Sequence, residues 1–407
     1  MSSTMRSAVM VLFGACLIVG LAFGVRQSFG LLMRPVTLDL GWSRETLSLV
    51  FAIQAVLNGF MAPFAGAVSD KWGVGRTIAM GCGFYGAGLG IMAFSATPTV
   101  MILGGGVLVG MGVSACGMPV LLGAVGKVAP EEKRSTWLGL VAVGATAGQL
   151  AIIPVTQFLV ANQGWSNALL VLAACFVIGL PIAYWMGQAA DRSVAGNANS
   201  GGASQNLSQA LVEARGHSGF ILLTIGFFVC GFQVQFVATH LPAFIEDQGF
   251  SAGFASNALV TIAGFNMVGA WFAGYLGGRF RKKYLLTAIY LLRAAAITVF
   301  MLTPITETTI LIFCATIGLI WLGTVPLTSG IVAQVFGPRF MSTLFGIVFL
   351  SHQLGNFTGA WVGGVVFDAT GSYEAVWWVA VGLGILAALF HAPIDDRPVA
   401  RLSAAAR

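Results

Sequence analysis

Apolar stretches of about twenty residues recur along nearly the whole chain, and they constrain its fold more than any other feature. A helix needs about 20 predominantly apolar residues to cross the hydrocarbon core of a bilayer. With that length as the criterion, we predict spans at 8–33, 44–68, 77–96, 98–124, 136–161, 166–188, 217–240, 252–276, 283–303, 308–333, 341–366 and 373–392. The predicted fold class is therefore an all-α polytopic membrane protein with twelve transmembrane helices.

The composition indicates that lipid is the solvent for most of this surface. Of the 407 residues, 57% are hydrophobic and 8% are charged, whereas a soluble domain contains about 25% charged residues. The 54 glycines would weaken soluble helices, but small residues let membrane helices pack closely. The six cysteines fall inside apolar stretches without CxxC spacing, so we interpret them as small hydrophobic residues and expect no metal site and no cofactor.

The longest polar interruption predicts how the chain is organised. It covers 189–216 and is rich in Ser, Gly, Asn and Ala, which is typical of a flexible linker. We therefore predict an N-terminal six-helix half at 1–188, a cytoplasmic linker at 189–216, a C-terminal six-helix half at 217–396 and a cytoplasmic tail at 397–407. In carriers with two such halves, each half contains inverted three-helix repeats, and the substrate binds between the halves near the bilayer midplane.

The distribution of Lys and Arg predicts the orientation. With a cytoplasmic N-terminus, sixteen basic residues fall on the inner side, and only Arg34 and Arg44 fall on the outer side. Short cytoplasmic loops are enriched in Lys and Arg, so both termini are expected in the cytoplasm. The net charge of +6 then reflects membrane topology, and we expect no nucleic-acid partner.

The loop after the second predicted span, GAVSDKWGVGRT at Gly66–Thr77, resembles the loop signature of the major facilitator superfamily, G-x-x-x-D-[RK]-x-G-x-x-[RK]. The resemblance implies the two-half transporter fold and close helix approach at its first glycine. The residues to which it assigns gating or conformational roles are Gly66, Asp70, Lys71, Gly73 and Arg76. The corresponding second-half loop, GYLGGRFRKKY, has Gly278 at the acidic position. The charge pairing of the inner gate is therefore expected to rest mainly on the first loop.

Three further segments narrow the resemblance: FGVRQSFGLLMRPV, GATAGQLAIIPVTQFLVANQGW and FGIVFLSHQLGNFTGAWVGGVVFDATGSY. Together they resemble bacterial members of the monocarboxylate transporter family and its oxalate/formate relatives. This implies a multi-pass carrier of the bacterial inner membrane, acting as a monomer, with a cation on the first span near Arg26. Animal members also have an Asp/Arg pair on the eighth span, but here that span contains neither acid nor base. Coupling to protons by that ion pair is therefore not expected.

Charged residues inside spans are costly and mark candidate sites. Arg26 lies in the first span, and its planar guanidinium suits bidentate binding of a carboxylate; snorkelling to outer headgroups is the alternative. Arg293, in the ninth span, has either a direct role or packs against carbonyls or a neighbouring helix. His352 is the candidate for proton coupling, with a hydrogen-bonded core histidine as the alternative. No acidic residue lies deep in a predicted span.

Several neutral polar side chains fall at a similar depth in the membrane. Each must bond to another helix, to water or to a ligand, so hydrogen bonding between helices is the alternative to substrate binding for each of them. The predicted substrate-binding residues are Arg26, Gln27, Cys116, Gln233, Gln235, Asn266, Trp321, His352, Gln353 and Asn356.

The leading hypothesis is a secondary active transporter that moves a small organic anion, with a monocarboxylate as the favoured substrate, by alternating access. Protons are the candidate coupling ion, and exchange is compatible with the lack of buried acids. The alternative is a major facilitator exporter of a drug, a metalloid or a neutral metabolite. We do not expect an enzyme, because the sequence contains no HExxH and no cluster of acidic residues at one membrane depth. Substrate identity, transport direction, coupling ion, oligomeric state and the role of Arg293 stay open.

Overall fold

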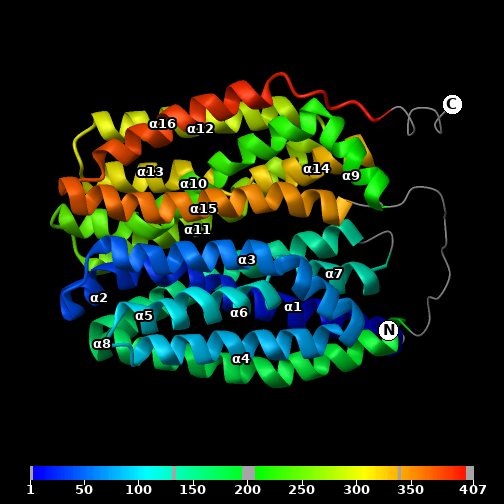
Figure 1. The fold of residues 1–407 in the computed structure, drawn as a ribbon, viewed down its shortest axis with the longest axis horizontal. Coiled ribbons are helices and arrows are strands. Elements are labelled where there is room, and N and C mark those ends of the chain that lie inside the picture. Colours follow the sequence, from blue (N-terminus) through cyan, green and yellow to red (C-terminus); the bar gives the residue numbers. More distant parts are fainter. Residues whose placement is uncertain (1–2, 131–133, 195–206, 338–340, 400–407) are drawn as a thin grey trace. The chain divides into compact units, whose positions relative to one another are not determined.

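The computed structural model describes residues 3–130, 134–194, 207–337 and 341–399, and in these ranges every regular element is a helix (Figure 1). Nine helical stretches of the described chain are long and apolar enough to cross a membrane. One of these, Gly139–Ala190, has 52 residues and corresponds to two predicted spans. Contacts divide the chain into two units, one formed by Met1–Gly201 with Ala238–Val260 and the other by Gly202–Val237 with Thr261–Arg407.

The described residues of the first half of the chain form ten helical segments. They are α1 (Ser3–Gln27), η1 (Ser28–Leu32), α2 (Met33–Leu40), α3 (Arg44–Trp72), α4 (Val74–Ala93), α5 (Pro98–Met101), η2 (Ile102–Leu108), α6 (Val109–Ala115), α7 (Met118–Val128) and α8 (Arg134–Val194). Within the first unit, α8 packs along both α1 and α4.

In the second half of the chain, the described residues form eight helices. They are α9 (Leu207–Gly216), α10 (Ser218–Asp247), α11 (Ala252–Gly277), α12 (Lys282–Leu302), α13 (Glu307–Leu319), α14 (Thr324–Phe336), α15 (Met341–Thr370) and α16 (Glu374–His391). Within the second unit, α12 packs against α16 and α14.

Gly164 bends α8 and separates the fifth and sixth predicted spans. Its φ of 79° and ψ of 164° lie in a region that side chains with a Cβ rarely adopt, so glycine is required here. The two spans predicted at 136–161 and 166–188 lie on either side of this bend.

Close contact between α1 and α8 depends on glycine. A Cβ on Gly24 would lie 2.6 Å from the carbonyl oxygen of Gly148, and a Cβ on Gly20 would lie 2.9 Å from that of Gly144. Because lipid provides no hydrophobic driving force between helices, this close backbone packing is a main source of their association.

The fourth and tenth predicted spans are interrupted, which the sequence-based prediction did not include. The fourth changes from α6 to α7 at Cys116 and Gly117, and the tenth changes from α13 to α14 between Leu319 and Thr324. A proline lies in the first turn of both second segments, Pro119 and Pro326. Proline fits a first turn, where no intrahelical N–H donor is needed, and so starts a new helix at each interruption.

The segment 189–216 differs from the expected flexible linker at both ends. Helix α8 continues to Val194 and α9 covers Leu207–Gly216, while residues 195–206 lie outside the described chain. Helix α9 forms here because small apolar residues recur four positions apart, so that Ala210 and Ala214 are buried on one face.

Candidate functional site

Arg26 lies in the last turn of α1, directly before the chain continues as the 3₁₀ helix η1. The last carbonyls of a helix have a partial negative charge that favours a cation at this place. The Tyr85 hydroxyl donates to the carbonyl oxygen of Ala22 (2.9 Å) and is close enough to the Arg26 guanidinium to interact with it electrostatically. Arg26 and Gln27 are both only partly buried. The structure therefore holds a half-buried arginine, whose Nε is shielded from solvent, beside a fixed hydroxyl group.

Cys116 lies at the interruption of the fourth span. Its Sγ is 3.9 Å from the Sγ of Cys82 and 3.7 Å from the carbonyl oxygen of Ile78, and both thiols are free and buried. These contacts join α4 to the end of α6. They favour the interhelical alternative for Cys116 over substrate binding.

The first signature loop joins α3 to α4. Gly73 has a φ of 89°, which explains the glycine at that position of the signature. Arg76 is exposed. A Cβ on Gly66 would have no described neighbour within 4 Å, so the close helix approach expected there is not found among the described residues. The side chains of Asp70 and Lys71 lie outside the described part of the chain.

Replacement of Asp70 by asparagine is expected to impair transport without preventing membrane insertion, because the signature assigns this carboxylate to gating charge pairing. Uptake kinetics in proteoliposomes and the yield of monodisperse protein after extraction measure the two effects separately. Normal uptake kinetics in the variant would remove Asp70 from the gate.

In the second unit, Arg293 is the centre of a buried polar cluster. Its Nε and Nη2 donate to the carbonyl oxygen of Ile320 at 3.1 and 2.6 Å, and Nη2 also donates to the carbonyl oxygen of Trp321. Its Nη1 donates to Cys230 Sγ and to Gln233 Oε1, both at 3.4 Å. The guanidinium donors are thus occupied by two backbone carbonyls, an amide oxygen and a cysteine sulfur.

The placement of Arg293 explains how a buried cation is tolerated without a carboxylate partner among the described residues. Arg293 is 2% exposed, and it caps the carbonyls that follow the last turn of α13. The negative end of a helix dipole and these carbonyls compensate its charge. Arg293 thus packs against carbonyls, which favours that alternative over a direct role.

Asn266 completes the hydrogen bonding of the same interruption. Its Oδ1 accepts the N–H of Leu322 at 3.1 Å. Asn266 on α11 therefore satisfies a backbone N–H of the broken helix, whereas Arg293 on α12 satisfies backbone carbonyls. Trp321 is buried at 2% exposure within the interruption. A backbone break at membrane depth requires such internal partners. Asn266 and Trp321, both predicted to bind substrate, therefore belong to one structural arrangement with Arg293.

Cys230 on α10 links this arrangement to two further helices. Its Sγ is 3.1 Å from Thr324 Oγ1, and Tyr290 and His352 are both close enough to interact with the thiol. Gln233, one turn further along α10, donates from Nε2 to the carbonyl oxygen of Ala380 at 2.9 Å. Because Gln233 also accepts from Arg293, its amide is occupied by helix contacts.

His352, Gln353 and Asn356 lie together on α15. The His352 Nδ1 is 3.4 Å from Gln353 Oε1, and Asn356 Nδ2 donates to the same oxygen. Gln353 Nε2 and Asn356 Oδ1 are buried without a hydrogen-bond partner among the described residues. Polar groups left open at this depth need water or a ligand. Gln235 is also buried, at 9% exposure, on α10.

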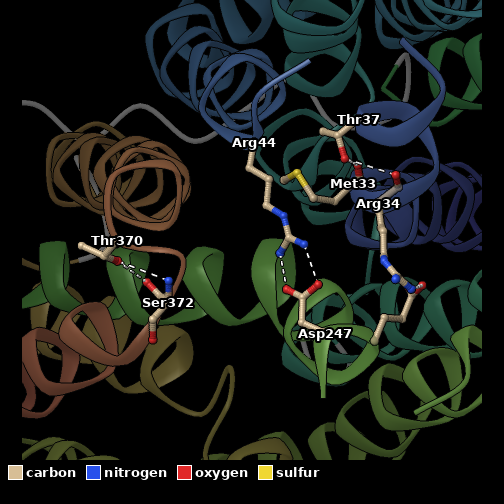
Figure 2. A network of polar contacts seen from close by, with 8 residues as sticks. Met33, Arg34, Thr37, Arg44, Asp247, Thr370 and Ser372 are labelled. Atoms are coloured by element: carbon tan, nitrogen blue, oxygen red, sulfur yellow. Dashed lines mark hydrogen bonds and ion pairs between the residues drawn. The ribbon is translucent and has the colours of Figure 1, made fainter. Parts of the chain in front are cut away.

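The two basic residues that the sequence assigns to the outer side each pair with an acid at the end of α10. Figure 2 shows the guanidinium of Arg44 facing Asp247, with Nη1–Oδ2 at 2.6 Å and Nη2–Oδ1 at 2.7 Å. Arg34 Nη1 is 3.2 Å from Glu246 Oε2. All four residues belong to the first unit. Arg34 and Arg44, the two basic residues assigned to the outer side, are therefore each neutralised by an acidic partner.

Sequence reasoning did not identify Tyr85, Cys230 or Tyr290 as site residues. Tyr290 lies three residues before Arg293 on α12, and Cys230 lies three residues before Gln233 on α10. Residues three apart share a helix face, so this spacing is a signal that could have identified both.

Long apolar helices, broken spans with polar linings and a partly accessible arginine define a polytopic helical carrier. The family model of the Major Facilitator Superfamily matches residues 12–360, so the chain belongs to this superfamily of carriers, which are not enzymes. The predicted twelve-helix, two-half fold class is thereby confirmed.

Relatives from bacteria and from animals match nearly the whole chain. An uncharacterized MFS-type transporter of Bacillus subtilis is 23% identical and covers 92% of each chain. Monocarboxylate transporter 13 of Rattus norvegicus is 25% identical over 94% of this chain and 89% of its own.

Solved structures show the same fold. A bacterial homolog of the human lysosomal transporter Spinster, in an inward-facing and unoccupied conformation, has a TM-score of 0.77 at 16% identity and covers 96% of this chain and 97% of its own. The D-xylose-proton symporter has a TM-score of 0.72 at 16% identity, covering 96% and 98%.

Proposed function

We propose that this superfamily member is a secondary transporter of a small organic anion, with a monocarboxylate as the favoured substrate. The observation that supports this most directly is Arg26, a partly buried cation at the end of α1 in a chain with no acidic residue deep in its predicted spans. An arginine presents a planar pair of donors that matches a carboxylate.

The contrast with Arg293 strengthens the assignment to Arg26. Arg293 is fully buried, and its donors are occupied by carbonyls, Gln233 and Cys230. A substrate would have to displace several of these bonds to reach it. Arg26 is the intramembrane arginine with a partly exposed side chain, which leaves it better placed to meet an anion.

The name of the rat relative, monocarboxylate transporter 13, supports the same substrate class. We further propose placement in a bacterial inner membrane with both termini cytoplasmic, from the sixteen inner basic residues. His352 is the proposed proton carrier, since its imidazole is buried beside the Cys230 thiol and histidine is the usual side chain for a proton relay near neutral pH. The boundaries 1–188 and 217–396 are proposed for the two functional halves.

The purified protein in proteoliposomes is expected to take up labelled lactate, pyruvate, oxalate or formate, and faster with an inward proton gradient than without one. Empty liposomes and labelled xylose, a sugar without a carboxylate, serve as controls. Carboxylate uptake that is insensitive to the proton gradient but stimulated by internal carboxylate would indicate exchange and exclude His352 as an obligatory carrier. Transport of neutral compounds alone, or drug resistance on expression, would replace the proposal with the exporter alternative.

A further inference from the structure

The second signature copy lacks an acidic residue, because Gly278 occupies that position. Four basic residues follow it closely: Arg279, Arg281, Lys282 and Lys283. In the structure, a carboxylate reaches this basic group from a distant part of the chain. It belongs to Asp396, which lies after the last helix, α16.

Asp396 forms a two-point ion pair with Arg281. The distance from Nη2 to Oδ1 is 2.5 Å and that from Nε to Oδ2 is 3.3 Å. The Asp396 side chain is only 5% exposed, whereas that of Arg281 is 51% exposed. A bidentate arginine–carboxylate pair fixes orientation as well as distance. The Asp396 carboxylate is therefore buried in the protein, and the ion pair is not a contact between two exposed side chains.

The residues around Asp396, 392–399, are held by further bonds, and we refer to them as the C-terminal strap. Lys283 Nζ donates to the carbonyl oxygen of Ile394 at 2.7 Å, and Gln334 Nε2 donates to that of Asp396 at 2.8 Å. The N–H of Val399 donates to the carbonyl oxygen of Val335 at 3.0 Å. The strap thus contacts the start of α12 and the end of α14.

Lys282 adds a direct link between these two helices. Its Nζ donates to Gln334 Oε1 at 2.9 Å, and the other end of the same amide holds the strap. All these residues belong to the second unit. The network therefore joins three segments that are separated by tens of residues in the sequence.

We propose that the C-terminal strap supplies, through Asp396, the acid that the second signature copy lacks. Asp396 acts as a positioning residue: it seats the strap and fixes the start of α12 to the end of α14, so that these helix ends move as one body during transport. This role does not depend on which substrate the protein carries.

The charged surroundings give the pairing a defined pH dependence. The hydrogen bond from Arg281 holds the pKa of Asp396 below its usual value, and Lys283 acts in the same direction. Asp395 and Tyr284 are the other titratable groups that interact with Arg281. A carboxylate with a lowered pKa stabilises the fold above its unfolded-state pKa, and this stabilisation is lost as the pH falls through its folded-state pKa.

The test compares Asp396→Asn with the matched neighbour Asp395→Asn. Asp395 is 57% exposed and lies 4.0 Å from Arg397. We expect Asp396→Asn to lower the Tm of the purified full-length protein at neutral pH and to speed hydrogen–deuterium exchange in the strap, where the Val399 N–H bonds to Val335. The Tm difference from wild type should vanish at strongly acidic pH. Asp395→Asn should leave both quantities close to wild type.

Exchanging the two charged residues of the pair distinguishes an effect of the ion pair from a loss of packing around Asp396. The double variant Arg281→Asp/Asp396→Arg should recover part of the Tm and of the slow hydrogen exchange in the strap that either single reversal loses. Equal behaviour of Asp396→Asn and Asp395→Asn, or no recovery in the double variant, would overturn the proposal. Both readouts use protein without substrate, so a failure to transport carboxylates would refute the proposed function and leave this test intact.

Discussion

Replacing Arg26 with alanine is expected to reduce carboxylate uptake by about tenfold to 150-fold, the equivalent of about 1.5–3 kcal/mol for a hydrogen bond to a charged group. The variant would lose the cation at the end of α1 while keeping the helix itself, because alanine is the best helix former. Initial rates of labelled lactate or pyruvate uptake over a range of concentrations measure the loss as a change in Vmax/KM.

Two matched variants make this result specific. Arg26→Lys keeps the charge but loses the planar pair of donors, so we expect an intermediate rate with a raised KM. Arg34→Ala removes an arginine eight positions later in the chain that already pairs with Glu246, and its effect on KM should be small. Equal Vmax/KM for Arg26→Ala and wild type would remove the anion-binding role.

Replacing Arg293 with glutamine is expected to impair folding before it affects transport. The variant leaves the carbonyls of Ile320 and Trp321 without their donor in a buried place. Each unsatisfied buried group costs about 1–3 kcal/mol. We expect a lower Tm and a smaller monodisperse fraction in size-exclusion chromatography. Arg293→Lys should recover only part of the loss, since one ammonium cannot reproduce the spread of the guanidinium donors.

Arg215→Gln provides the control for Arg293, because Arg215 is an exposed arginine on α9. This variant should keep the wild-type Tm and elution profile. If Arg293→Gln instead folds with a wild-type Tm but shows a raised KM for carboxylates, Arg293 contacts substrate and its role as a cap of α13 is wrong.

The two arginines show why residue type alone did not assign the site. Both lie in apolar stretches, and the cost of an intramembrane charge marked both as candidates. What separates them is the environment that each meets in the folded chain. One ends a helix beside a tyrosine hydroxyl and stays partly exposed, while the other is enclosed by carbonyls of a broken helix.

The sequence by itself determined the class of fold. Span lengths, the bend at Gly164 between two predicted spans and the signature loop follow from local properties, namely runs of apolar residues and the conformational freedom of glycine. A count of apolar residues does not register the interruptions at Gly117 and Ile320, because those residues are as apolar as a continuous span requires.

Only the tertiary structure decided which polar groups meet. The acid missing at Gly278 comes from Asp396, and the carbonyls freed near Ile320 are satisfied by Arg293 from another helix. Such partners are set by how helices pack, and no periodicity along one segment encodes a contact with another. The apolar stretches determine that this chain crosses a membrane. Helix packing places Arg293 against the carbonyls of a broken helix, and Arg26 is therefore the candidate anion-binding residue.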